Sequence, residues 1–169
     1  LKDLPAIEKV IVVPYTENEP DISAIPKAVH YGEFLAKESG LKIQFEQLPF
    51  EHPLYIMFTS GTTGLPKCMV QSAGGILIHH MKELMLHTNL TREDTIFYFT
   101  TCGWMMWNWL VSSLSLGAKL FLFDGNPFHP HPGALWRAAQ DEGITIFGTS
   151  AGYISALMNE GVRPGKEYD

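Results

Sequence analysis

The sequence is poor in cysteine, in charge and in long apolar runs, and each shortage excludes a class of protein. Its two cysteines, Cys68 and Cys102, are too few for a disulfide framework and fit a reducing compartment. We expect both to be small buried residues, with a catalytic thiol as the alternative. No apolar run has the length of a membrane-spanning helix, and no signal peptide is expected. Charged residues make up 18% of the chain and its net charge is −6, which argues against a general nucleic-acid or anionic-membrane surface.

The rest of the composition is that of a folded domain. The 169 residues are 46% apolar, enough for one domain with a core of its own. Hydrophobic periodicity predicts strands at residues 10–13, 43–45, 54–58, 95–100, 119–123 and 145–147. It predicts helices at residues 26–39, 72–87, 110–116, 134–142 and 151–159, and loops at 16–23, 124–132 and 161–169. Because strands alternate with helices, we expect an α/β fold of parallel βαβ units.

The apolar strand at residues 54–58 leads into a loop of hydroxyl groups and glycines. The loop reads Thr59, Ser60, Gly61, Thr62, Thr63, Gly64, Leu65, Pro66, Lys67. The two glycines permit positive φ angles and close approach of backbone N–H groups to a ligand, and the hydroxyls and Lys67 add further donors. Such a concentration of donors predicts a site for the polyphosphate of a nucleotide.

This loop differs from a Walker A motif. Two residues separate Gly61 from Gly64, where a Walker A motif has four, and no Gly-Lys-Ser/Thr sequence ends the loop. A polar surface turn after a strand is the simpler alternative. Nine consecutive residues that fit one phosphate-loop pattern favour the binding site.

A segment that follows the phosphate loop has the hydrophobic pattern of a surface helix. The helix at residues 72–87 is amphipathic, with Leu77, Met81, Leu84 and Met85 on one face. Its histidines lack acidic or cysteine partners at metal-ligand spacing, so we expect polar helix-face residues and no metal site; they are His79, His80 and His87.

A second segment follows the strand at residues 95–100 and contains three tryptophans and two methionines within six positions, 104–109. We expect half of these side chains to pack in the core. The other half are candidates for lining a small-molecule pocket, because ligands of open α/β sheets bind outside the carboxyl ends of the strands.

Residues Thr59 to Lys67 resemble the phosphate loop of the adenylate-forming superfamily, which comprises acyl-CoA synthetases, luciferases and peptide-synthetase adenylation domains. Segments 55–84 and 100–130 are similar, more closely, to the acetoacetyl-CoA synthetase family, with acetyl- and propionyl-CoA synthetases as the next relatives. Most such loops have glycine after the lysine. Cys68 at that position, together with the run Cys102-Gly103-Trp104-Met105-Met106-Trp107, fits the acetoacetyl branch.

The resemblance implies a two-step ligase. A carboxylate attacks the α-phosphate of ATP to give an acyl-adenylate and pyrophosphate, and the thiol of CoA then displaces AMP. ATP, Mg²⁺ and CoA are thus the implied cofactors and co-substrates, acetoacetate is the implied acid, and a cytosolic enzyme without nucleic-acid partners is expected.

The implied site residues come from two segments. Thr59, Ser60, Gly61, Thr62, Thr63, Gly64 and Lys67 would bind the ATP phosphates, with Lys67 and Thr62 catalytic. Trp104, Met105, Met106 and Trp107 would border the acyl pocket.

The resemblance also implies that residues 1–169 are an incomplete parallel-sheet part of the large N-terminal AMP-binding domain. The later adenine, ribose and metal-binding motifs and the mobile C-terminal domain have no counterpart in the sequence, so we expect these residues alone to be inactive. Two alternatives stay open: another short-chain acyl-CoA ligase, or a nucleotide-binding module complete in itself.

Overall fold

A computed structural model describes residues 2–35, 40, 42–59 and 64–168 of the chain. The chain divides into two compact units, Leu1–Gln47 and Leu48–Asp169.

The first unit is built on a pair of short parallel strands. Strand β1 (Val10–Val12) pairs with β2 (Ala28–His30), and the short helix α1 (Tyr31–Phe34) follows directly. The strand expected at residues 10–13 is confirmed. The helix expected from residue 26 is wrong in its first part, because residues 28–30 form hydrogen bonds with the distant strand β1 instead of within a helical segment. The strand expected at 43–45 is also wrong: Ile43 and Phe45 are unpaired and about four-fifths exposed, at 78% and 79%.

The second unit begins with an antiparallel pair of strands, β3 (Pro53–Thr59) and β4 (Lys67–Ser72). The sequence predicted the first strand but assigned no element between the phosphate loop and the helix expected from residue 72, so β4 was missed. Its polar and apolar residues alternate too irregularly to reveal a strand, and its pairing with β3 supplies the order. The expectation of parallel pairing throughout is therefore corrected here.

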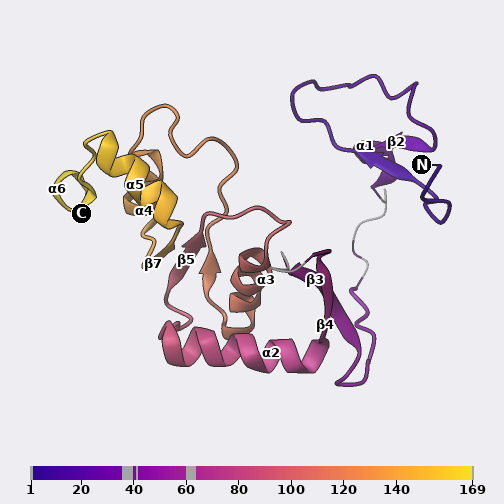
Figure 1. Ribbon diagram of the computed structural model, residues 1–169, viewed down its shortest axis with the longest axis horizontal. Coiled ribbons are helices and arrows are strands. Elements are labelled where there is room, and N and C mark those ends of the chain that lie inside the picture. Colours follow the sequence, from indigo (N-terminus) through magenta and orange to yellow (C-terminus); the bar gives the residue numbers. More distant parts are fainter. Residues whose placement is uncertain (1, 36–39, 41, 60–63, 169) are drawn as a thin grey trace. The chain divides into compact units, whose positions relative to one another are not determined.

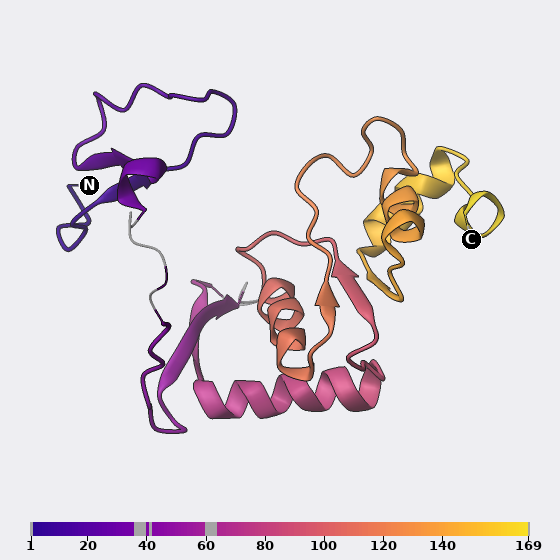
Figure 2. The same ribbon diagram turned by 180° about the vertical axis from the view of Figure 1, so that it is seen from behind.

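Helix α2 (Ala73–Lys82) starts where β4 ends. The Ser72 hydroxyl accepts a hydrogen bond from the Gly75 amide and so caps the helix. The helix continues as a π-helical segment, η1 (Glu83–His87), so the helix expected at residues 72–87 is confirmed. Figures 1 and 2 show α2 running beneath α3 (Met105–Ser112) from the strand pair toward β5 (Thr95–Tyr98).

The remainder of this unit is a parallel sheet of order β6-β5-β7, in which β5 lies between β6 (Lys119–Leu120) and β7 (Ile146–Gly148). This confirms the predicted βαβ arrangement for this part of the chain. Helices α4 (Ala134–Glu142) and α5 (Ala151–Asn159) have the bounds that the sequence predicted. Helix α3 begins five residues before the predicted helix, and the 3₁₀ segment η2 (Ser113–Leu116) completes it. A short helix, α6 (Pro164–Glu167), replaces part of the expected terminal loop.

The sheet has a hydrophobic core on each face. On one side Ile96 packs with Leu84 and Leu110, which come from η1 and α3. On the other side Phe97 packs with Leu135 and Leu157, from α4 and α5. Because consecutive strand residues point to opposite faces, the two neighbours Ile96 and Phe97 belong to different cores. The result is a three-layer α/β arrangement around β5.

Within the described part of the chain, no helix combines the length and hydrophobicity needed to cross a membrane.

Candidate functional site

The strand pair β3–β4 brings the two ends of the phosphate-loop segment together. Thr59, the last residue of β3, lies opposite Lys67, the first residue of β4. Gly64 has a φ of +146°, a conformation that a side chain would strain, so a glycine is required at this point. The other predicted phosphate-binding residues lie outside the described residues; they are Ser60, Gly61, Thr62 and Thr63.

One face of the strand pair is turned toward helix α3. The Sδ atom of Met57 lies 3.3 Å from Nδ2 of Asn108, which donates to it from α3. Because side chains alternate along a strand, the face that carries Met57 also carries Thr59, Lys67 and Gln71. The ends of the phosphate-loop segment and the face toward α3 therefore belong to the same side of the strand pair.

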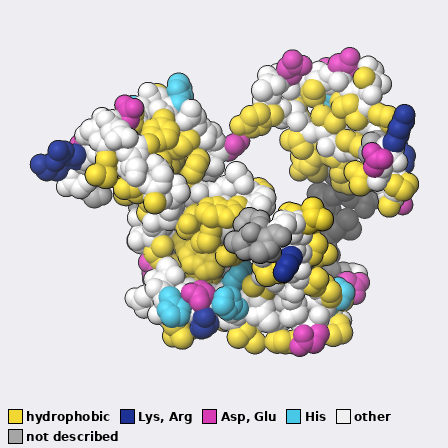
Figure 3. Space-filling view, viewed as in Figure 1, with side chains coloured by type: hydrophobic (Ala, Val, Ile, Leu, Met, Phe, Trp, Pro, Cys, Tyr) yellow, Lys and Arg dark blue, Asp and Glu magenta, His cyan; other side chains and the backbone are white. Residues whose placement is uncertain are grey.

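A cavity of about 340 Å³ lies between β4, α2 and α3. It is lined by Gln71, Ile76, His79, His80, Glu83, Met105, Met106 and Trp109. Figure 3 shows hydrophobic side chains gathered over α3, with histidine and charged side chains along α2 below them. The cavity thus combines an apolar wall with a polar one, which is the usual composition of a small-molecule site.

The residues predicted for the acyl pocket divide between this cavity and its surroundings. Met105 and Met106 line the cavity, whereas Trp104 and Trp107 are not among its lining residues. Trp104 is half exposed and its ring packs edge-on against Tyr98. Trp109 lines the cavity and also packs against the core of the sheet.

Sequence reasoning missed the wall that α2 contributes. Its members are Ile76, His79 and His80 of α2 and Glu83, the first residue of η1; they have the spacing of one helical face, and that spacing was the available signal. The predicted apolar face was only partly right: Leu84 is buried, but Leu77 and Met85 are 42% and 48% exposed. The burial of the continuous α2–η1 segment is centred on His80 of α2 and Leu84 of η1, which shifts the buried stripe away from Leu77.

His80 is a buried histidine with a defined partner, which corrects its expected place on the polar helix face. Only 2% of it is exposed, and its Nδ1 atom lies 2.8 Å from Oγ of Ser112 on α3. Burial, and to a lesser extent the neighbouring His79, lowers the pKa of His80 from the ordinary histidine value of 6.5. His79 and His87 are exposed, as predicted.

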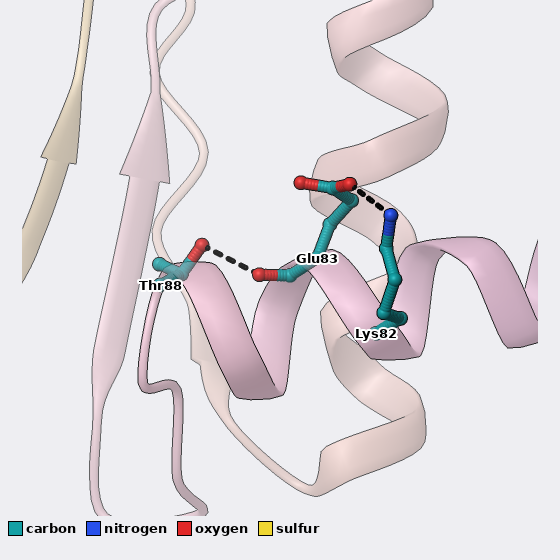
Figure 4. Close-up of polar contacts among 3 residues, drawn as sticks. All are labelled: Lys82, Glu83 and Thr88. Atoms are coloured by element: carbon teal, nitrogen blue, oxygen red, sulfur yellow. Dashed lines mark hydrogen bonds and ion pairs between the residues drawn. The ribbon is translucent and has the colours of Figure 1, made fainter.

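Polar contacts hold the end of the α2–η1 segment beside the cavity (Figure 4). The Thr88 hydroxyl donates to the Glu83 carbonyl at 3.2 Å, and the Thr88 amide donates to the same oxygen at 3.0 Å. The Glu83 carboxylate pairs with Lys82, which lowers the pKa of Glu83. These contacts satisfy a carbonyl at the helix end and fix the segment that carries Glu83.

The other face of the strand pair is an exposed apolar surface. It is formed by Leu54, Ile56, Phe58, Cys68 and Val70. Both Cys68 and Cys102 are exposed, so the prediction that they are buried was wrong. Cys68 faces outward because it alternates with Lys67 and Met69, which occupy the side toward α3. Among the described residues, no group of three or more His, Cys, Asp or Glu side chains could hold a metal ion.

Comparison with known proteins matches the chain to a family model and to related proteins. The family model described as AMP-binding enzyme matches residues 2–169. The acetoacetyl-CoA synthetase of Mus musculus is 52% identical over 169 residues, covering 97% of this chain and 25% of the mouse protein. The malonamoyl-CoA synthetase of Penicillium aethiopicum is 41% identical over 170 residues, covering 91% of this chain and 24% of the fungal protein.

A solved structure agrees with the sequence relatives. The acetoacetyl-CoA synthetase from Streptomyces lividans matches with a TM-score of 0.84 and 43% identity, over 99% of this chain and 25% of the bacterial one. The chain therefore spans about a quarter of the length of the curated relatives it matches.

Proposed function

The chain belongs to the AMP-binding enzyme family, and from that premise we propose that it is part of an enzyme that ligates acetoacetate to CoA through an acyl-adenylate. The observation that carries the proposal is the 52% identity to a synthetase of that name along nearly the whole chain. In the proposed reaction the carboxylate attacks the α-phosphate of ATP and expels pyrophosphate. The CoA thiol then attacks the acyl carbon and AMP leaves.

In this proposal the segment from Thr59 to Lys67 holds the β- and γ-phosphates. Its residues in this role are Thr59, Ser60, Gly61, Thr62, Thr63, Gly64 and Lys67. Pyrophosphate leaves as its negative charge grows, and each charge-assisted hydrogen bond stabilises it by about 1.5–3 kcal/mol. Lys67 and Thr62 are the proposed catalytic residues, and the register of Thr59 opposite Lys67 supports a common direction for the donors.

Mg²⁺ enters this proposal as a companion of ATP. In the part of the chain that the structure describes, no group of three or more His, Cys, Asp or Glu side chains could hold the ion. Because Mg²⁺ commonly binds through the phosphates of a nucleotide, we propose that it arrives with the polyphosphate and that Thr59 and Lys67 hold the phosphate oxygens beside it. When bound, the ion would neutralise phosphate charge.

The acyl group is proposed to enter the cavity beside Met105 and Met106. Their bulk leaves about 340 Å³, which suits a short acid better than a long fatty chain. The acyl groups named for the mouse and Penicillium relatives, acetoacetyl and malonamoyl, both have a second carbonyl one methylene away from the activated one. We extend this feature to the substrate of the present chain.

The same proposal implies a place in the domain, a class of partner and a cellular location for these residues. Residues 1–169 would be a part of the N-terminal AMP-binding domain, with small-molecule substrates and no nucleic-acid partner. The free cysteines Cys68 and Cys102 fit a cytosolic location.

ATP–pyrophosphate exchange tests the proposal. The full-length protein and the 169-residue chain would be compared with acetoacetate, acetate, propionate and octanoate. We expect exchange by the full-length protein, strongest with acetoacetate, and none by the 169 residues alone. Strongest exchange with another acid would keep the mechanism and change the substrate. Absence of exchange with every acid would favour a nucleotide-binding module instead.

A further inference from the structure

The cavity contains one side-chain amide in its wall, that of Gln71, to which the reaction proposed above assigns no role. Gln71 is half-buried on β4, opposite Tyr55, on the face that looks toward α3. Within the described part of the chain its side-chain amide has no hydrogen-bond partner. A half-buried amide beside Met105 and Met106 loses water without gaining a protein partner, so a ligand group that accepts its hydrogen bond would be favoured.

His80 cannot supply a donor to the same ligand in its neutral form. The single hydroxyl hydrogen of Ser112 is directed to the Asn108 carbonyl, 3.0 Å away. With the hydroxyl hydrogen on that carbonyl, the tautomer that satisfies the 2.8 Å contact carries the ring proton on Nδ1 of His80 and donates it to the Ser112 oxygen. Since burial favours the neutral ring, Nε2 is left as an acceptor.

Two other cavity residues carry side-chain N–H groups, but each is less suited than Gln71 to donate a hydrogen bond to a ligand. His79 is solvent-exposed, so water competes for its ring nitrogens. Trp109 is fixed by packing, with its ring edge-on to Tyr98 at a centroid distance of 6.2 Å. Gln71 is both partly shielded from water and without a partner among the described residues.

Resting on the proposed function, we propose that the Gln71 side-chain amide donates a hydrogen bond to the second carbonyl of the acyl substrate. Gln71 is then the residue that selects 3-oxo acids over simple alkanoic acids of the same length. In butyrate a methylene group replaces the 3-oxo group of acetoacetate. Binding butyrate would shield Gln71 from water and leave its amide unpaired, and sites built around a substrate hydrogen bond discriminate strongly against analogues that lack it.

The test is the ratio of kcat/KM for acetoacetate to kcat/KM for butyrate, measured with the full-length enzyme. The variant Gln71→Met keeps the length of the side chain and removes the donor. We expect it to lower kcat/KM for acetoacetate by about tenfold to a hundredfold, the effect of one lost hydrogen bond, and to leave butyrate within about threefold, so that the ratio falls. The matched control is Gln44→Met, the same substitution at an exposed glutamine, and it should leave both values unchanged.

A second variant separates recognition from folding. Gln71→Glu keeps the shape of the side chain but replaces the neutral amide with an anionic carboxylate that offers no N–H donor. The charge acts on both acids alike, so the loss of the donor should still reduce the ratio at least as much as in Gln71→Met. An equal loss for both acids in both variants would assign Gln71 a purely structural role and overturn the proposal. So would an unchanged ratio, or a ratio that falls in Trp109→Phe and not in Gln71→Met.

Failure of the proposed function gives a different result. In that case the unaltered full-length protein would exchange pyrophosphate with neither acid, and the inference would fall with the function. Wild-type exchange that prefers acetoacetate, combined with an unaltered ratio in the Gln71 variants, overturns the role of Gln71 alone.

Discussion

The Nδ1 atom of His80 and the Oγ atom of Ser112 lie 2.8 Å apart, and this contact joins α2 to α3 beside the cavity. The two residues are 32 positions apart in the sequence. Because the Ser112 hydroxyl also donates to the Asn108 carbonyl, the three groups form a short chain of hydrogen bonds. The chain fixes the separation of the two helices whose side chains line the cavity.

His80 should make the stability of the folded protein depend on pH. The folded state holds the pKa of His80 below 6.5, so as the pH falls below 6.5 the unfolded chain binds a proton that the folded chain rejects. This contribution to stability is complete above 6.5 and is lost as the pH falls toward the folded pKa. Urea unfolding between about pH 7 and pH 5 should therefore show decreasing stability.

His80→Gln provides the control for that experiment. It cannot titrate in this range, so its stability should depend less on pH than that of the wild type. Equal slopes for the two proteins would contradict the lowered pKa of His80.

A second pH effect is expected at lower pH from Asp94. Its carboxylate accepts hydrogen bonds from the Thr145 hydroxyl at 2.8 Å and from the Thr91 amide at 2.7 Å. These bonds, that from Thr145 first, lower the pKa of Asp94 from 3.8. The stabilisation is present above the unfolded value and is lost as the pH falls through the folded pKa. Asp94→Asn should be less stable at neutral pH and should flatten the acid limb of the stability curve, measured by thermal unfolding.

Tyr153→Phe should leave the protein as stable as before or more stable by up to about 1 kcal/mol. The Tyr153 hydroxyl is buried and has no partner among the described residues, and burial raises the pKa of this phenol to about 12. Removing the hydroxyl removes an unpaired polar group while the ring keeps its contact with Phe128. Urea unfolding measures the change, and Tyr153→Ala, which empties the site, should lose about 3–5 kcal/mol. A clear loss of stability in Tyr153→Phe would reveal a partner for the hydroxyl.

Gly148→Ala should destabilise the sheet. Gly148 on β7 lies opposite Tyr98 on β5, and a methyl group at that position would overlap the Tyr98 ring. Displacing a packed ring typically costs about 1–3 kcal/mol, which thermal unfolding would detect. Gly165→Ala is the matched control, because a methyl group there meets open space. Similar melting temperatures for the two variants would contradict the close packing of Tyr98.

Lys67→Ala tests the proposed phosphate site. If Lys67 stabilises the departing pyrophosphate, its removal from the full-length enzyme should lower ATP–pyrophosphate exchange by about 10²–10³-fold, with the fold intact. Lys119→Ala removes an exposed lysine that pairs with Glu142, and exchange should be unchanged. Normal exchange in Lys67→Ala would take the catalytic role away from this residue.

How far the sequence predicts the fold depends on whether the deciding interactions are local. Helices α4 and α5 were predicted to the residue because their boundary signals are nearby: Gly143 ends α4 with a φ of +63°, and Ser150 caps α5 by accepting from the Tyr153 amide. Strand β4 was missed because its conformation depends on β3. The burial of His80 was missed for the same kind of reason, since its partner Ser112 belongs to another helix.

The residues of the candidate site also divide into those that a local sequence pattern indicates and those that only long-range packing brings together. The phosphate-loop pattern and the methionines of α3 were evident in the sequence because each lies in one short segment. Gln71 and His80 carry no motif, and they join Met105 and Met106 only when β4, α2 and α3 are packed together.

The double-faced strand β5 also bears on how errors in folding are avoided. If β5 slipped by one residue against its neighbours, Ile96 would turn to the face of α4 and α5, and Phe97 would turn to the face of α3. Each hydrophobic core would then receive a side chain of the wrong volume, and the packing of both cores would be disrupted together. A shifted pairing therefore gains native packing on neither face of the sheet. The difference in size between Ile96 and Phe97 thus favours a single register of the strands.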